Sequence, residues 1–189
     1  MTINTRADVV ALLQQRGGLA YAGEGVTQLQ HGWLCARIAQ LQQASTALQL
    51  AAWLHDIGHL ISTLPGSPTL AGIDDSHEAL GGRLLRRLFG PAVAGPVALH
   101  VGAKRYLVAT QPAYAATLSA DSLRSLVLQG GSMTDNECTR FIARPHARQA
   151  LRLRHWDDAA KTPGLRPHSE GQALAELAAL MAAVPALPE

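Results

Sequence analysis

His55 and Asp56 stand side by side in the apolar segment 53–59, and His59 follows one helical turn later. Burying a charged carboxylate is costly unless a partner compensates the charge, and a metal ion does so. Imidazole and carboxylate ligands suit zinc, iron or manganese rather than a soft metal. One His-Asp pair cannot fill a coordination sphere, so we expect other segments to supply further ligands.

The further candidate ligands lie in separate predicted helices. The complete set is His31, His55, Asp56, His77, His100 and Asp157. Each has an ordinary alternative when taken alone, because a helical histidine is more often a surface or hydrogen-bonded residue and an aspartate is often a surface charge. Together, four histidines and two aspartates can hold two metal ions if Asp56 bridges them. Two adjacent metals can share one substrate and polarise or oxidise it.

Cationic side chains lie about one helical turn from these candidates. Lys104 follows His100 by four residues and Arg154 precedes Asp157 by three, so each cation shares a helix face with a candidate ligand. Ser122 lies in the first turn of a predicted helix, where free N–H groups attract anions. Taken singly, such cations are more often solvated surface charges. Their joint position favours a site for a phosphate or phosphonate group.

The composition indicates an all-α fold, which we expect to be one helical domain spanning residues 1–189. Hydrophobic residues make up 48% of the chain but aromatic residues only 4%, so Leu, Ala and Val must build the core. Leu and Ala are strong helix formers, and no block of the sequence is typical of strands. The net charge of +2, without a basic run, argues against nucleic acid as a partner.

The sequence also indicates where the protein resides and the state of its two cysteines. The N-terminal segment lacks the apolar stretch of a signal peptide, and no run approaches the ~20 apolar residues of a membrane helix. We therefore expect a soluble, cytoplasmic protein. Cys35 and Cys138 form no CxxC motif, and we expect free, buried thiols, with a disulfide as the alternative.

Helix start and stop signals predict the elements that must position the candidate site. The predicted helices cover residues 6–16, 25–43, 46–56, 74–88, a short segment with Pro96 in its first turn, 119–129, 135–143, 145–160 and 170–183. Thr5 or Asn4, Ser45 and Ser119 are the expected N-caps. Gly58 is expected to end helix 46–56, and the Pro- and Gly-rich residues 63–72 are expected to form a surface loop.

The chain resembles the HD-domain superfamily, whose members are mostly metal-dependent phosphohydrolases and share the pattern H…HD…D. The residues that carry this pattern are His31, His55, Asp56 and Asp157. His77 and His100 mark the two-metal subset. From about Tyr21 to Lys161 the chain resembles more closely the HD-domain mixed-valent diiron oxygenases that cleave hydroxyphosphonates. The supporting segments are 21–24, 28–31, 55–59, 75–78, 99–106, 128–131 and 154–161, whereas 62–73 and 108–118 are not obviously similar.

The resemblance implies an Fe(II)/Fe(III) pair as the cofactor. The ligands of one iron would be His31, His55, Asp56 and Asp157. The ligands of the other would be His77, His100 and the bridging Asp56. The residues implied to bind the phosphonate are His59, Lys104, Ser122 and Arg154, with Gln28 lining the same pocket.

The resemblance also implies a gate and an activity. Tyr21 would occupy an iron until substrate displaces it, and Glu24 would pair with Tyr21 and face the substrate amine; His59 joins these two as a catalytic residue. The implied enzyme uses O2 to cleave the carbon–phosphorus bond of 1-hydroxy-2-aminoethylphosphonate, releasing phosphate and glycine. The N-trimethyl analogue would give glycine betaine instead.

The sequence is open to two other interpretations. In an HD-family phosphohydrolase acting on a nucleotide or small phosphate ester, two metals would activate water while Lys104 and Arg154 held the scissile phosphate. A gate of Tyr21 and Glu24 argues against hydrolysis, which does not need one. The complete ligand set argues against a non-catalytic metal-binding or ligand-sensing module. The sequence leaves the amine state of the substrate and the oligomeric state open.

Overall fold

The structure is a computed structural model that describes residues 2–21, 25–62, 64, 68–161, 167 and 169–185. In these residues the chain forms α-helices, one 3-10 helix and an isolated β-bridge between Ala20 and Thr27, without a strand. The expected all-α class is therefore confirmed. The helices are α1 (Arg6–Arg16), α2 (Gln28–Leu41), α3 (Thr46–Leu54), α4 (Ile57–Ile61), α5 (His77–Phe89), α6 (Pro91–Thr110), η1 (Tyr114–Thr117), α7 (Ala120–Leu128), α8 (Asp135–Ile142), α9 (Ala147–Ala159) and α10 (Glu170–Ala183).

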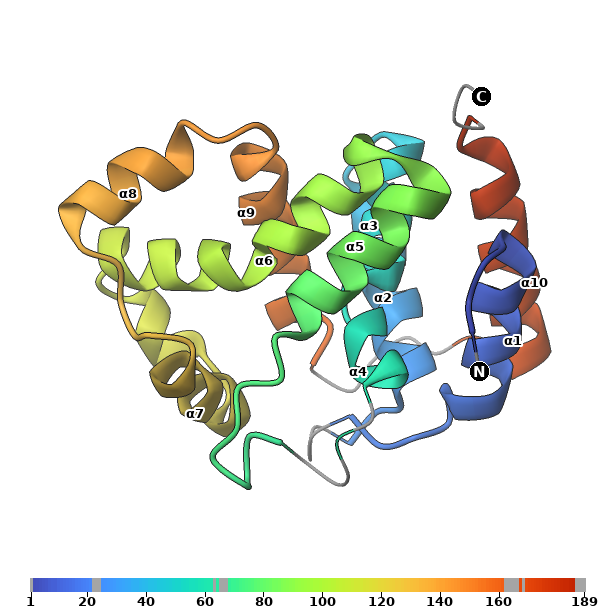
Figure 1. Cartoon of the computed structure of the whole chain (residues 1–189), viewed down its shortest axis with the longest axis horizontal. Coiled ribbons are helices and arrows are strands. Elements are labelled where there is room, and N and C mark those ends of the chain that lie inside the picture. Colours follow the sequence, from blue (N-terminus) through green and yellow to red (C-terminus); the bar gives the residue numbers. More distant parts are fainter. Residues whose placement is uncertain are drawn as a thin grey trace.

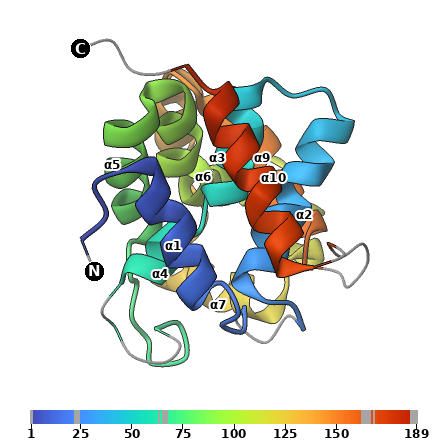
Figure 2. The same ribbon diagram turned by 90° about the vertical axis from the view of Figure 1, so that its right-hand side faces the viewer.

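The long helix α6 runs through the middle of the molecule and packs against α5, α9 and α3. Helices α2 and α3 lie beside this group, and α1 and α10 pack together on one side of the bundle (Figures 1 and 2). Helices α7 and α8 lie at the opposite side from α1 and α10 (Figure 1). The site described below lies where α2, α4, α5, α6 and α9 approach one another.

Leu, Ala and Val dominate the main core, as the composition predicts. Its larger members are Trp33, Trp53 and Trp156, one each from α2, α3 and α9. Among the described residues, none of the helices combines the length and apolarity that crossing a bilayer requires. Cys35 and Cys138 are both free, Cys35 fully buried and Cys138 partly exposed.

Side-chain caps fix several helix starts where the sequence predicts them. The Thr5 hydroxyl accepts a hydrogen bond from the Asp8 amide, and the Asp8 carboxylate accepts one from the Thr5 amide, which forms a capping box at α1. Ser45 and Ser119 cap α3 and α7 with a single side-chain bond, each hydroxyl accepting from the amide three residues on. Local hydrogen bonding explains why these boundaries are readable from sequence.

Three predicted boundaries near the site are wrong. Helix 46–56 ends at Leu54, and the chain turns at His55 and Asp56 before Gly58 enters α4 instead of ending a helix. Helix 74–88 begins only at His77, because Ser76 adopts a left-handed backbone (φ 48°) that interrupts the helix. Both turns direct candidate ligands inward from helix ends. Of the expected loop 63–72, the described residues 64 and 68–72 are partly or fully exposed.

The helix that carries His100 is also longer than predicted. It begins at Pro91, directly after Gly90 (φ 80°), and Pro96 lies inside it rather than in its first turn. Pro91 occupies the first helical position, where a missing N–H costs nothing. An interior proline removes one backbone hydrogen bond, which the packing of α6 against three other helices offsets. The other boundaries differ by a few residues: α2 begins at Gln28, after its cap Thr27, and α9 at Ala147.

Candidate metal centre and anion pocket

The six candidate ligands converge on one buried place although they come from five parts of the chain. The helix α2 supplies one ligand, the α3–α4 turn two, and α5, α6 and α9 one each. Each of the six residues is at most 8% exposed. The residues are His31, His55, Asp56, His77, His100 and Asp157. Separate helices therefore bring together the set that the sequence predicts.

The first group of donor atoms surrounds one point. His31 Nε2 lies 3.3 Å from His55 Nε2 and 3.3 Å from Asp157 Oδ1. His55 Nε2 lies 3.3 Å from Asp56 Oδ2. Two nitrogens bound at about 2.1 Å to one metal, at right angles, are about 3 Å apart. The spacing of this group thus fits a metal ion.

The second group meets the other oxygen of Asp56. His77 Nε2 and His100 Nε2 are 3.1 Å apart, and each lies 3.5 Å from Asp56 Oδ1. These three residues form one of the clusters whose donor atoms could hold a metal ion. Asp56 Oδ1 and Oδ2 therefore face different groups, which is the arrangement that a carboxylate bridging two metals requires.

Hydrogen bonds behind the rings leave their Nε2 atoms free for a metal. His55 Nδ1 donates to the carbonyl of Ala52 at 2.8 Å, and His100 Nδ1 donates to that of Val97 at 2.7 Å. A proton fixed on Nδ1 leaves a lone pair on Nε2. Asp157 Oδ1 is buried and lies 3.3 Å from His31 Nε2 and 3.3 Å from Lys161 Nζ. Lone pairs aimed at one another in this way are satisfied by cations, so the residues fit two metal ions.

The charge states of His31, His100, Asp56 and Asp157 suit the same role, whereas Asp56, against the effect of burial, raises the pKa of His55 to about 10 in the metal-free protein. Burial lowers the pKa of His31 and of His100, which keeps both imidazoles neutral. Burial would raise the pKa of Asp56, but His55 and the other nearby histidines hold it well below its usual range. Arg154 and then Lys161 do the same for Asp157 against its burial. Neutral imidazoles and ionised carboxylates are the forms that ligate metals.

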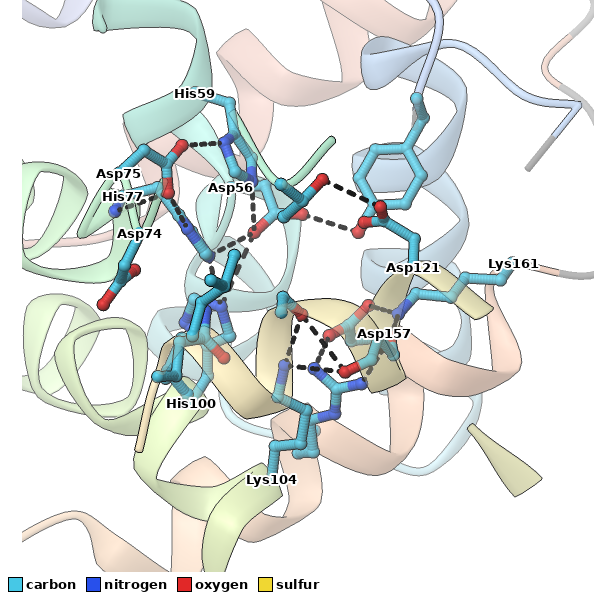
Figure 3. Close-up of a pocket in the computed structure, with 18 of the residues that line it drawn as sticks. Asp56, His59, Asp74, Asp75, His77, His100, Lys104, Asp121, Asp157 and Lys161 are labelled. Atoms are coloured by element: carbon cyan, nitrogen blue, oxygen red, sulfur yellow. Dashed lines mark hydrogen bonds and ion pairs between the residues drawn. The ribbon is translucent and has the colours of Figure 1, made fainter. Parts of the chain in front are cut away.

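A pocket with several cations adjoins the metal centre (Figure 3). Ser122 Oγ accepts hydrogen bonds from Arg154 Nη2 at 3.2 Å and from Lys161 Nζ at 2.8 Å. Lys104 Nζ donates to the Ser122 carbonyl at 3.3 Å and to Ser125 Oγ at 2.7 Å. Lys104 is 2% exposed and Arg154 is 3% exposed. The pocket has a volume of about 50 Å³, whereas one water needs roughly 10–15 Å³ on this measure, so the site suits a compact ligand.

These buried cations favour an anionic ligand. Burial, and then repulsion by Arg154 and Lys161, lowers the pKa of Lys104 to about 7. The nearby carboxylates Asp157 and Asp158 pair with Arg154 and Lys161, not directly with Lys104. A bound anion would relieve the repulsion among the three cations, and charge-assisted hydrogen bonds to it would be short and strong.

The structure brings Tyr21 and His59 to the same pocket. The Tyr21 hydroxyl donates to Asp56 Oδ2 at 2.8 Å, and its ring stacks on His31 at 4.0 Å between centroids. His59 stacks on His77, with 3.9 Å between the ring centroids. Gln28 does not line this pocket; it lines a smaller neighbouring cavity that also touches Asp56. Glu24 lies outside the described residues.

Several residues of the site carry roles that the sequence interpretation missed. Asp75 accepts from both His59 and His77, and its position two residues before His77 is the signal that could have pointed to it. Lys161 follows Asp157 by four residues, in the turn just after the end of α9, and its Nζ lies 3.3 Å from Asp157 Oδ1. Tyr114, whose hydroxyl contacts Arg154 Nε at 3.1 Å and also Asp158, comes from the unmatched segment 108–118 and had no signal.

Comparison with known proteins shows the family to which this chain belongs. A hydroxymethylphosphonate dioxygenase of Gimesia maris is 42% identical over 155 residues, which cover 82% of this chain and 77% of the relative. The chain belongs to the hydroxyphosphonate dioxygenase family. A [1-hydroxy-2-(trimethylamino)ethyl]phosphonate dioxygenase (glycine-betaine-forming) of Leisingera caerulea is 37% identical over 79% of the chain and 76% of the relative. No family model matches the sequence.

Membership in the hydroxyphosphonate dioxygenase family confirms the resemblance and the oxygenase class expected from the sequence. The buried clusters of histidine and aspartate in a helical bundle agree with a metal-dependent member of this family.

Proposed function

We propose that this protein is a two-iron oxygenase that uses O2 to cleave the carbon–phosphorus bond of a small 1-hydroxyphosphonate and releases phosphate. The observation that carries the proposal is Asp56, whose two oxygens face separate groups of histidines beside a pocket of buried cations. The relatives, one named for hydroxymethylphosphonate and one for a trimethylammonium phosphonate, support the substrate class.

The two groups of ligands would hold the irons, with Asp56 as the bridge. The ligands of one iron would be His31, His55, Asp56 and Asp157, and those of the other Asp56, His77 and His100. When bound, the iron pair would activate O2 and oxidise the substrate at the carbon that carries the hydroxyl and phosphonate groups. Imidazole and carboxylate ligands suit iron, although they also suit zinc and manganese.

The protein's own contribution is to bind and orient the substrate. Lys104, Arg154 and Ser122 would hold the phosphonate oxygens, and His59 would contact the same group from the opposite wall of the pocket. Holding the phosphonate would place the neighbouring carbon beside the metal centre. The binding energy of the phosphonate would thus fix the position of the reacting carbon relative to the metals. Because Lys104 and Arg154 are already desolvated, little solvent has to be removed when the anion binds.

Tyr21 would act as the gate of the pocket. Its hydroxyl donates to Asp56, so it occupies space beside the bridging carboxylate that the substrate hydroxyl would enter. Displacing Tyr21 would open the metal centre only when substrate is present, which limits side reactions of O2. Glu24, in the segment directly after Tyr21, would face the amine of an amino-substituted substrate.

The substituent on the reacting carbon is proposed to be compact, as in hydroxymethylphosphonate or 2-amino-1-hydroxyethylphosphonate, which would yield glycine. Proteins commonly recognise a trimethylammonium group with several aromatic rings. Every Trp, Tyr and Phe of the chain lies in a described segment, and among the described residues that line the pocket Tyr21 is the one such ring. Its face is already stacked on His31. The trimethyl analogue, which would yield glycine betaine, should therefore be the poorer substrate.

The test is phosphate release that depends on oxygen. Protein loaded with Fe(II) should consume O2 and release phosphate when given hydroxymethylphosphonate or 2-amino-1-hydroxyethylphosphonate, and less with the trimethyl analogue. Phosphonates without the hydroxyl group should give neither signal. Phosphate release under strict anaerobiosis would overturn the proposal and would favour a phosphohydrolase. Preference for the trimethyl analogue would overturn only the compact-substituent assignment.

A further inference from the structure

One carboxylate, Asp75, connects the two sides of the site. Asp75 Oδ2 lies 2.6 Å from His59 Nδ1, and Asp75 Oδ1 lies 2.9 Å from His77 Nδ1. The two rings that it contacts are stacked, with centroids 3.9 Å apart and an angle of 24° between their planes. Figure 3 shows Asp75 beside both histidines at one wall of the pocket. The Asp75 side chain is 6% exposed, so solvent competes little for these contacts.

These contacts decide which ring nitrogen carries the proton. A carboxylate can only accept, so both Nδ1 atoms are the donors and both Nε2 atoms point away from Asp75. His77 Nε2 then faces Asp56 Oδ1 and His100 Nε2, at the second metal group. His59 Nε2 lies 4.0 Å from Asp56 Oδ1, at the edge of the anion pocket.

We propose that Asp75 is a positioning residue that orients the metal ligand His77 and the substrate-facing His59 together, so that one carboxylate couples metal binding to phosphonate binding. The proposal rests on the function proposed above, because it takes His77 as an iron ligand and His59 as a contact of the phosphonate. Partners behind a metal-bound histidine typically change metal affinity 10- to 100-fold.

The need for two acceptors explains why a carboxylate is required. Asn at position 75 would offer one carbonyl oxygen and one amide group. It could accept from only one of the two Nδ1 atoms and would donate to the other. The ring that receives this donation must carry its proton on Nε2. If that ring is His77, its Nε2 cannot bind a metal.

The neighbouring Asp74 provides a matched control. It is exposed, and its carboxylate accepts only from the Ser76 amide among the hydrogen bonds of the described residues. Asp74→Asn keeps an oxygen for this contact. Asp74→Asn and Asp75→Asn thus make the same chemical change at adjacent positions, and only the second removes an acceptor from the two histidines.

The first experiment reads the protonation of the rings directly. In metal-free, full-length protein, imidazole ¹⁵N shifts should report Nδ1–H for both His59 and His77. Asp75→Asn should convert one ring to the Nε2–H form, and Asp75→Glu, which retains two acceptor oxygens, should keep both as Nδ1–H. Asp74→Asn should match the wild type. Unchanged ring protonation in Asp75→Asn would overturn the proposal.

The second experiment measures the coupling. Asp75→Asn should lower iron affinity at one site roughly 10- to 100-fold and should also weaken the binding of methylphosphonate. His59→Ala should weaken methylphosphonate binding but keep both irons. Asp75→Asn should add little to the phosphonate loss already caused by His59→Ala. Full additivity of the two losses would overturn the coupling. These readouts need no turnover, so failure of the oxygenase assay leaves this test intact and separable.

Discussion

Gly58 in α4 lies directly against the backbone of His77 at the start of α5. A Cβ atom at position 58 would be 2.0 Å from the His77 carbonyl oxygen and 2.6 Å from the carbonyl carbon. Real Cβ atoms do not approach backbone so closely, and the obstacle is backbone that cannot rotate away. The absence of a side chain at Gly58 is therefore what allows the turn carrying Asp56 to meet the helix end carrying His77.

Gly58→Ala should separate α4 from α5 and disturb both the fold and the second metal group. Overpacking of a core typically costs about 1–3 kcal/mol, and a clash with backbone belongs at the upper end of that range. We expect a lower midpoint in urea unfolding of the metal-free protein and loss of one iron per chain on loading. Gly18→Ala is the control, because its Cβ would meet nothing within 4 Å. Equal stability of the two variants would contradict this account of the α4–α5 contact.

His77→Ala should remove one metal without removing the other. His77 belongs to the group around Asp56 Oδ1, whereas the group around Oδ2 draws on His31 and His55. Iron analysis should therefore fall from two ions to one per chain, and O2-dependent phosphate release should be lost. His155→Ala, an exposed histidine on α9, is the control and should keep both irons. Retention of two irons and full activity in His77→Ala would refute the two-metal assignment.

Lys104→Ala should weaken phosphonate binding while iron content stays intact. Lys104 Nζ is buried in the pocket and contacts Ser122 and Ser125 rather than a metal ligand. A hydrogen bond to a charged group is worth about 1.5–3 kcal/mol, so affinity should fall roughly 10- to 100-fold. Arg105→Ala is the control, since Arg105 contacts Gly131 and Glu137 instead. If Lys104→Ala lost iron, its role would be structural.

Anion binding should depend on pH through Lys104. Its pKa is about 7 in the free protein because of burial and the neighbouring cations, and a bound anion favours the protonated form. Affinity should therefore be level below pH 7 and should fall by up to tenfold per pH unit above it. Calorimetry of metal-free protein with sulfate, which keeps its charge from pH 6 to 9, tests this. Lys104→Ala should abolish most of the slope; a slope unchanged in that variant would assign the titration to another group.

Tyr21→Phe should keep the stack on His31 but remove the donor to Asp56. Asp56 Oδ2 then loses a buried hydrogen bond, which typically costs about 1 kcal/mol. Thermal unfolding of metal-free protein should show this loss. Tyr106→Phe is the control because the Tyr106 ring packs on Phe141 away from the site. Equal stability of the wild type and Tyr21→Phe in the metal-free state would contradict this role of the Tyr21–Asp56 hydrogen bond.

Many residues of the site can be predicted from residue type and from spacing within a helix. The pairs His100–Lys104 and Arg154–Asp157 are separated by one helical turn, and each pair does lie at the site. Caps such as Thr5 and Ser119 were also readable, because a cap depends on hydrogen bonds within three or four residues. The starts of α5 and α6 were not, because nothing local in the sequence signals the left-handed Ser76, and Pro96 lies inside α6, which packs against α5, α9 and α3.

The sequence by itself determined the helical class, the six candidate ligands and the presence of cations one helical turn from two of them, since these follow from composition and from spacing within single helices. Only the tertiary structure decided that Asp56 Oδ1 and Oδ2 face different histidine groups and that Asp75 serves both His59 and His77. Such relations depend on how closely helices approach, and that distance is set by long-range packing such as Gly58 against His77.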